Sequence, residues 1–156
     1  MALRTYHISR RQAVAGVAAT GAGMLVGLAM GSEEALAAND YAEQIRKFTG
    51  GRQPVEGLLR LELPELAENG NTVPMSVTVD ASLRSDVHVE EILVVAPANP
   101  NSRVVRFRFS PMSVPEAATR IRLAETQNVI AVAKLSDGTF FSTSRQIKVT
   151  IGGCGG

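Results

Sequence analysis

The stretch Thr72–Asp80 reads Thr-Val-Pro-Met-Ser-Val-Thr-Val-Asp and is the clearest indication of the fold class. Every second residue from Val73 to Val79 is apolar, and a proline, a serine and a threonine stand between them. Successive side chains of a strand point to opposite faces, so this period of two predicts a strand with one buried face.

The same pattern recurs along most of the chain. Further segments that alternate or are apolar are 55–63, 87–96, 104–109, 117–124, 129–135 and 139–151. The end of 87–96 is continuously apolar, so we expect it to be covered on both faces. Asp137-Gly138 is typical of a tight hairpin. About seven short strands, broken by turn residues, predict an all-β sandwich of immunoglobulin-like type.

A short helix is expected before the strands. Asn39 or Asp40 can cap its start, and Gly50-Gly51 ends it. Three apolar residues lie at helical spacing on one face: Tyr41, Ile45 and Phe48. We therefore place a β-sandwich domain, with this helix at its start, over residues 38–151.

Residues 1–37 have the features of an export signal. Three bases precede the uncharged segment 13–30: Arg4, Arg10 and Arg11. Ala35 and Ala37 have the spacing of a small-residue cleavage site. The segment Ser9–Val14 is similar to the twin-arginine motif, so we expect export to the periplasm by that route. The alternative is a membrane anchor, but four glycines make segment 13–30 too weakly hydrophobic to favour it.

Composition excludes several classes of function. The 156-residue chain has sixteen basic and fifteen acidic side chains, and this near-neutral balance disfavours nucleic-acid binding. With one cysteine and two histidines, of which only His88 follows the signal, blue-copper and zinc sites lack ligands. We expect no metal and no cofactor. Alternating bases on two strands indicate a solvated face or, less favoured, a site for anionic partners: Arg103, Arg106, Arg108, Arg120 and Arg122.

The carboxyl terminus is the one feature that a sandwich does not explain. The only cysteine, Cys154, has two glycines on each side: Gly152, Gly153, Gly155 and Gly156. Glycine loses the most entropy on ordering, so residues 152–156 are predicted to form a flexible terminal arm that extends about 17 Å. No basic residue is closer in sequence than Lys148. Cys154 is therefore interpreted as a chemical handle whose thiol a partner activates.

Other interpretations of this end are weaker. Prenylation needs a cysteine four residues from the terminus, and Cys154 is third. A terminal Gly-Gly is similar to ubiquitin-like sulfur carriers, but those are cytoplasmic proteins of mixed α/β fold. A lone exposed thiol in an oxidising compartment invites intermolecular disulfides and overoxidation, so its presence there needs a reason.

The whole combination resembles the SoxY family, the sulfur-carrying subunits of the SoxYZ complex in the periplasmic sulfur-oxidation (Sox) pathway. The segments that carry the resemblance are Ile147–Gly156, Thr119–Ala124, Ala131–Gly138 and Asn99-Pro100. The terminal Gly-Gly-Cys-Gly-Gly is the most specific of them. The resemblance implies that Cys154 is the covalent site of substrate attachment.

The resemblance also implies partners. A c-type cytochrome would join thiosulfate to the Cys154 sulfur, giving a cysteine S-thiosulfonate. A sulfate-releasing hydrolase would leave a persulfide, and a sulfane dehydrogenase would oxidise its outer sulfur. The chain itself would not be an enzyme. A SoxZ-like β-sandwich subunit would complete a heterodimer, and four phenylalanines are a candidate apolar contact: Phe107, Phe109, Phe140 and Phe141.

Two other functions are kept as alternatives. One is a non-catalytic periplasmic binding module whose tail tethers it to a partner by a disulfide. The other is an enzyme with Cys154 as nucleophile and His88 as base. That pair requires proximity, which nothing in the sequence provides.

Overall fold

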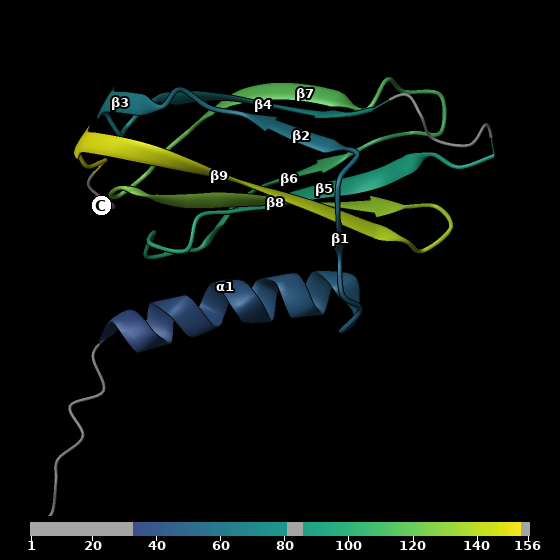
Figure 1. Cartoon of the computed structure of the whole chain (residues 1–156), viewed down its shortest axis with the longest axis horizontal. Helices are drawn as coiled ribbons and strands as arrows, with labels where there is room; N and C mark the ends of the chain where they lie inside the picture. Colours follow the sequence, from purple (N-terminus) through teal and green to yellow (C-terminus); the bar gives the residue numbers. More distant parts are fainter. Residues whose placement is uncertain (1–32, 81–85, 154–156) are drawn as a thin grey trace, which may run out of the picture. The chain divides into compact units, whose positions relative to one another are not determined.

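The computed structural model describes residues 33–80 and 86–153, with side chains from Asp40 onward. Within this part the chain forms two sheets and one helix (Figure 1). The larger sheet has the order β1-β9-β8-β5-β6, with β3 also paired to β9, and the smaller has the order β2-β4-β7. The predicted all-β sandwich with a short N-terminal helix is confirmed.

The strands follow the predicted segments closely. They are β1 (Val55–Glu56), β2 (Leu59–Glu62), β3 (Leu66–Asn69), β4 (Val73–Val79), β5 (Val89–Val95), β6 (Arg103–Arg108), β7 (Glu116–Ile121), β8 (Gln127–Leu135) and β9 (Phe140–Ile151). Segment 55–63 divides into β1 and β2, because Gly57 and Leu58 have positive φ and turn the chain between two sheets. The sequence pattern missed β3 altogether.

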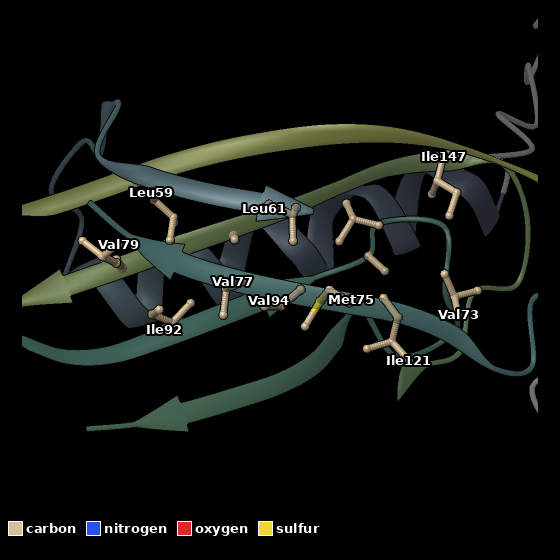
Figure 2. Packing of buried hydrophobic residues seen from close by; sticks show 14 of the residues in the cluster. Leu59, Leu61, Val73, Met75, Val77, Val79, Ile92, Val94, Ile121 and Ile147 are labelled. Atoms are coloured by element: carbon tan, nitrogen blue, oxygen red, sulfur yellow. The ribbon is translucent and has the colours of Figure 1, made fainter. Parts of the chain in front are cut away.

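The core lies between the two sheets, and β4 supplies one side of it (Figure 2). Val73, Met75, Val77 and Val79 are all buried, as their spacing predicted. They pack with buried residues of the larger sheet, which include Ile92, Val94 and Ile147. Burying such side chains stabilises the fold by about 1.5–3 kcal/mol each.

The second half of β5 is buried on both faces, as predicted. Ile92 and Val94 face the sandwich core, whereas Leu93 and Val95 alternate with them and are equally buried. Helix α1 (Glu33–Thr49) contacts β5 on that second face. This contact explains why a sheet of a two-layer sandwich carries a continuous apolar run.

Two contacts join helix α1 to the rest of the fold. The ring of Phe48 stacks edge-on against Phe140 at 5.9 Å between centroids, and the Arg106 guanidinium lies 5.2 Å from the Phe48 ring. Near the middle of the helix, Ser102 Oγ donates a hydrogen bond to Asp40 Oδ2 at 2.9 Å. The helix starts before the predicted cap and passes the predicted cleavage site after Ala37. Residues 1–32 lie outside the described residues, so the export signal stays a prediction.

The four phenylalanines do not form an exposed apolar face, and that prediction is wrong. Phe140 is buried and stacks on Phe48. Phe107, Phe109 and Phe141 are half-buried and pack against the core. Their rings are therefore used inside this chain, because the alternation placed them on faces that the helix and the second sheet cover.

No helix in residues 33–80 and 86–153 is long and apolar enough to cross a bilayer.

Candidate functional site

The first part of β9 and its carboxyl end pair with different neighbouring strands. β9 pairs with β8 from Phe140 to Ile147, where β8 begins opposite it at Gln127. From Lys148 to Ile151 it pairs instead with β3, in parallel. The last residues before the terminal arm are therefore held mainly by β3, the strand that the sequence pattern missed.

Beyond the part of β9 that pairs with β8, a threonine hydroxyl forms hydrogen bonds with the β9 main chain. The Val149 N–H donates to Thr126 Oγ1 at 2.9 Å, and that hydroxyl lies 3.5 Å from the Val149 carbonyl oxygen. Thr126 precedes β8 directly. The exposed side of β9 is thus tied to the loop that leads into β8.

Three backbone hydrogen bonds connect the end of β9 to two other segments. The Gly70 N–H donates to the Ile151 carbonyl at 2.8 Å, and the Leu123 N–H donates to the Gly70 carbonyl at 2.8 Å. The Gly153 N–H then donates to the Leu123 carbonyl at 2.9 Å. We call this junction, formed by Gly70, residues 123–124 and residues 151–153, the tail clamp.

The glycines of the tail clamp allow main chains to touch. A Cβ at Gly70 would overlap the Leu123 carbonyl oxygen, and one at Gly152 would overlap the Ala124 carbonyl oxygen. A Cβ at Gly153 would lie 2.7 Å from the Gly70 carbonyl group. Real Cβ atoms do not approach backbone so closely, so each of these positions requires glycine in this arrangement.

The structure places the first two residues of the predicted flexible arm against the sandwich. Gly153 is buried and hydrogen-bonded, and Gly152 is half-buried against Ala124. The missing side chains serve close packing here instead of chain freedom. Cys154, Gly155 and Gly156 lie outside the described residues, so the flexibility of the arm stays a prediction.

A side-chain network holds the 122–125 loop that faces the tail. Asn99 Oδ1 accepts from the Ala124 N–H at 2.9 Å, and Asn99 Nδ2 donates to the Arg122 carbonyl at 2.8 Å. Gln127, which is 7% exposed, donates to the same Asn99 Oδ1 at 3.1 Å. Its Oε1 accepts from the Ala98 N–H at 2.9 Å. This role of Asn99 was not predicted, because its partners lie 23–28 residues away in sequence.

His88 lies far from the tail. Its main chain pairs with Ser136, just before β5 begins. At the other end of that strand, the Asn99 N–H donates a hydrogen bond to the Ala96 carbonyl oxygen at 3.1 Å. Eight strand residues separate these ends by about 26 Å. The tail clamp is at the Asn99 end, so His88 is not placed to act as a base for a thiol beside Gly153.

The five arginines separate into two groups. Arg106 and Arg108 reach Glu91, at 3.6 and 3.0 Å. The other three line a hollow between the edge strands β6 and β7: Arg103, Arg120 and Arg122. Within the described part of the chain no ion pair joins these three to a carboxylate.

In the described ranges no group of three or more His, Cys, Asp or Glu side chains is placed to hold a metal ion. The absence of a metal and of a cofactor stays a prediction from the sequence.

The fold and its end define a class: a β-sandwich that anchors a cysteine-bearing terminal segment at one end. A family model described as "Sulfur oxidation protein SoxY" matches residues 45–154. The chain therefore belongs to the SoxY family of sulfur oxidation proteins. The match includes the tail clamp and reaches Cys154.

Solved structures agree with this assignment. The sulfur carrier protein SoxY from Chlorobium limicola f thiosulfatophilum is 29% identical, with a TM-score of 0.60, over 73% of this chain and 99% of that one. No match is found among curated proteins.

More distant structures share the fold alone. The superoxide reductase (neelaredoxin) of Ignicoccus hospitalis is 16% identical, with a TM-score of 0.52, over 60% of this chain and 80% of its own. The superoxide reductase of Nanoarchaeum equitans is 11% identical, with a TM-score of 0.50, over 61% and 100%.

Proposed function

We propose that this SoxY-family protein is a sulfur carrier and that the Cys154 thiol is its point of covalent attachment. The observation that carries the proposal is the tail clamp, which anchors the main chain at Gly153, directly before the cysteine. The family and the solved relative, itself a sulfur carrier protein, support the same role.

The chemistry requires partners that supply the oxidant and the catalytic groups. A solvated thiol has a pKa of about 8.5, so a few per cent of it is thiolate at neutral pH. A c-type cytochrome would take two electrons as the Cys154 sulfur bonds to the outer sulfur of thiosulfate, with loss of the thiol proton. The product is a cysteine S-thiosulfonate, which carries one negative charge.

Later steps return the thiol to its starting state. A hydrolase would use one water to break the bond between the sulfane and sulfonate sulfurs, releasing sulfate and leaving a persulfide. A sulfane dehydrogenase would oxidise the outer sulfur with three waters and loss of six electrons. A second hydrolysis would release sulfate and restore the Cys154 thiolate.

The carrier role assigns no catalysis to the chain alone. The one described histidine, His88, lies at the far end of β5 from the tail clamp, which supports this assignment against an enzyme with a Cys154–His88 pair. We further propose a heterodimer with a SoxZ-like subunit, and export to the periplasm by the twin-arginine route.

The Cys154→Ser variant separates the three candidate functions. For a carrier, the variant folds normally, and thiosulfate oxidation reconstituted with the partner proteins stops. A binding module would keep both partner affinity and pathway rate in the variant under reducing conditions, which would overturn the proposal. Turnover of thiosulfate by the purified chain alone would also contradict it and would favour an enzyme.

A further inference from the structure

We infer that the hollow between β6 and β7 is a docking site for a carboxylate-rich surface of the enzymes that act on the carried sulfur. Three arginines line this hollow, which we call the arginine hollow: Arg103, Arg120 and Arg122. The identity of the partner rests on the proposed carrier role. Binding of carboxylates at the hollow can nevertheless be measured without any sulfur chemistry.

The arginine hollow lies at an open side of the sandwich. β6 is the last strand of the larger sheet and β7 the last strand of the smaller one, and the two sheets form the two layers of the fold (Figure 1). The hollow has a volume of about 430 Å³, and its lining includes Val104 of β6 and Ile121 of β7. A volume of that size holds several side chains of a partner, more than a single sulfate or thiosulfate ion fills.

The arginine hollow has a local excess of positive charge. The described residues that line it include three arginines and no carboxylate, although the whole chain has sixteen bases and fifteen acids. All three side chains are exposed, and in the described ranges none of them forms an ion pair. By contrast, Arg106 and Arg108 of β6 both reach Glu91. The lining arginines repel one another, and carboxylates from a partner would relieve that repulsion.

Hydrogen bonds fix the main chain that carries two of the arginines. Asn101 Oδ1 accepts from the Arg103 N–H at 3.2 Å, and Asn99 Nδ2 donates to the Arg122 carbonyl at 2.8 Å. The buried Ser102 ties the same loop to helix α1 through a hydrogen bond of 2.9 Å. Docking therefore does not have to order this part of the main chain, which lowers the entropy cost of binding.

Arg120 projects from the strand on the opposite wall. It pairs in register with Pro74 of β4, and its Nη1 lies 3.5 Å from Thr72 Oγ1. That long contact uses one N–H group of the guanidinium and leaves the others for a ligand. Because a guanidinium can bind a carboxylate through two parallel hydrogen bonds, the arginine hollow suits a segment with several Asp or Glu side chains.

The charge of the hollow favours an enzyme over the permanent subunit of a heterodimer. Permanent interfaces are more apolar, and charged residues are depleted at their centre. Exposed charge pairs instead speed association and add only modest affinity. A carrier has to release one enzyme before it meets the next, so contacts of this reversible kind suit it.

The arginine hollow is also at a suitable end of the sandwich. Arg122 directly precedes Leu123, whose N–H donates to the Gly70 carbonyl at 2.8 Å. The Gly70 N–H in turn donates to the carbonyl of Ile151, the last residue of β9, at 2.8 Å. An enzyme that docks on the hollow would therefore lie near the carboxyl end of β9.

An NMR titration of the purified protein with hexaglutamate, under reducing conditions, tests the site. We expect saturable shifts of the Asn101, Arg103, Arg120 and Arg122 amides, and no such shifts with hexaglutamine. Absence of saturable shifts at these amides would overturn the inference. Saturation by thiosulfate at the same concentration would show a small-anion site and would overturn the assignment to a carboxylate-rich protein surface.

Two double variants with the same loss of charge sharpen this test. Arg120→Gln with Arg122→Gln should weaken hexaglutamate binding about tenfold. Arg60→Gln with Arg145→Gln should leave it within twofold, because those two exposed arginines line a hollow at the opposite edge strand, β2. Equal weakening by both would show a general charge effect and contradict the site. Thermal unfolding checks that each variant remains folded.

The functional consequence has its own measurement. With the sulfate-releasing hydrolase and the loaded carrier, Arg120→Gln with Arg122→Gln should raise KM for the carrier about tenfold at low salt and leave kcat within twofold. The difference should disappear in about 0.5 M sodium chloride, which screens exposed charges. An unchanged KM would contradict the docking role. Absence of turnover with the wild-type carrier would instead contradict the proposed function and leave the peptide result standing.

Discussion

At the scale of residues, glycine has two separate roles in this chain. Gly50 and Gly51 have positive φ and end helix α1, with open space around them. Gly70, Gly152 and Gly153 are required because main chains touch there. The same residue type thus ends an element in one place and allows close packing in another.

Gly70→Ala should lower the free energy of unfolding by about 1–3 kcal/mol, because the new Cβ would overlap the Leu123 carbonyl. Denaturant unfolding measures this change. Asn71→Ala, in the same turn and exposed, is the control and should change stability by less than about 0.5 kcal/mol. Equal midpoints for the two variants would show that the turn moves aside at little cost.

The sequence indicated the cysteine but not its surroundings. Cys154 stands out because it is a single thiol between glycines, which can be seen locally. The burial of Gly153 depends on Gly70 and Leu123, which only the folded topology brings beside it. Asn99 escaped notice for the same reason, since its partners are far from it in sequence.

At the scale of elements, β9 connects the core to the tail. Its first part lies in the middle of the larger sheet, and its last four residues pair with β3. Period-two alternation predicted β4 well, because that strand is long and every second side chain in it is buried. It could not predict β3, which has four residues and a single buried side chain, Ala67.

Ile147→Ala should lower the free energy of unfolding by about 2–5 kcal/mol, because Ile147 is fully buried in the core. Ile151→Ala, on the same strand, should change it by less than about 0.5 kcal/mol, because Ile151 is 67% exposed. Chemical denaturation of both variants provides the comparison. A loss at Ile151 as large as that at Ile147 would contradict the described burial.

Helix α1 should be held to the sheet largely through Phe48. Phe48→Ala removes the edge-on contact with Phe140 and the contact with Arg106, and should cost about 1–2 kcal/mol. Lys47→Ala, one residue earlier and exposed, is the control. Near-identical melting temperatures for the two variants would show that the helix contributes little to the stability of the sandwich.

At the scale of the whole molecule, the fold by itself does not indicate the function. Superoxide reductases share the sandwich at 11–16% identity, so the fold alone does not indicate sulfur chemistry. What distinguishes this chain is its carboxyl end, where β3, the 122–125 loop and the tail meet. The family match, which extends to residue 154, includes that end.

At the same scale, we predict that residues 1–37 direct export of the protein by the twin-arginine route. Replacing Arg10 and Arg11 together by lysine should abolish the periplasmic form and leave the precursor in the cytoplasm, because the twin-arginine route requires the pair. Arg4→Lys keeps the same charge outside the motif and should be exported normally. Cell fractionation with immunoblotting distinguishes them, and normal export of the double variant would exclude this route.

Covalent carriage of sulfur by Cys154 can be tested by measuring the intact mass of the protein. The protein is purified from cells given thiosulfate, beside the Cys154→Ser variant. We expect sulfur-containing mass increments on the wild type alone, all removed by reductant. Only the bare mass, only a plain disulfide-linked dimer, or the same increments on the serine variant would contradict the claim.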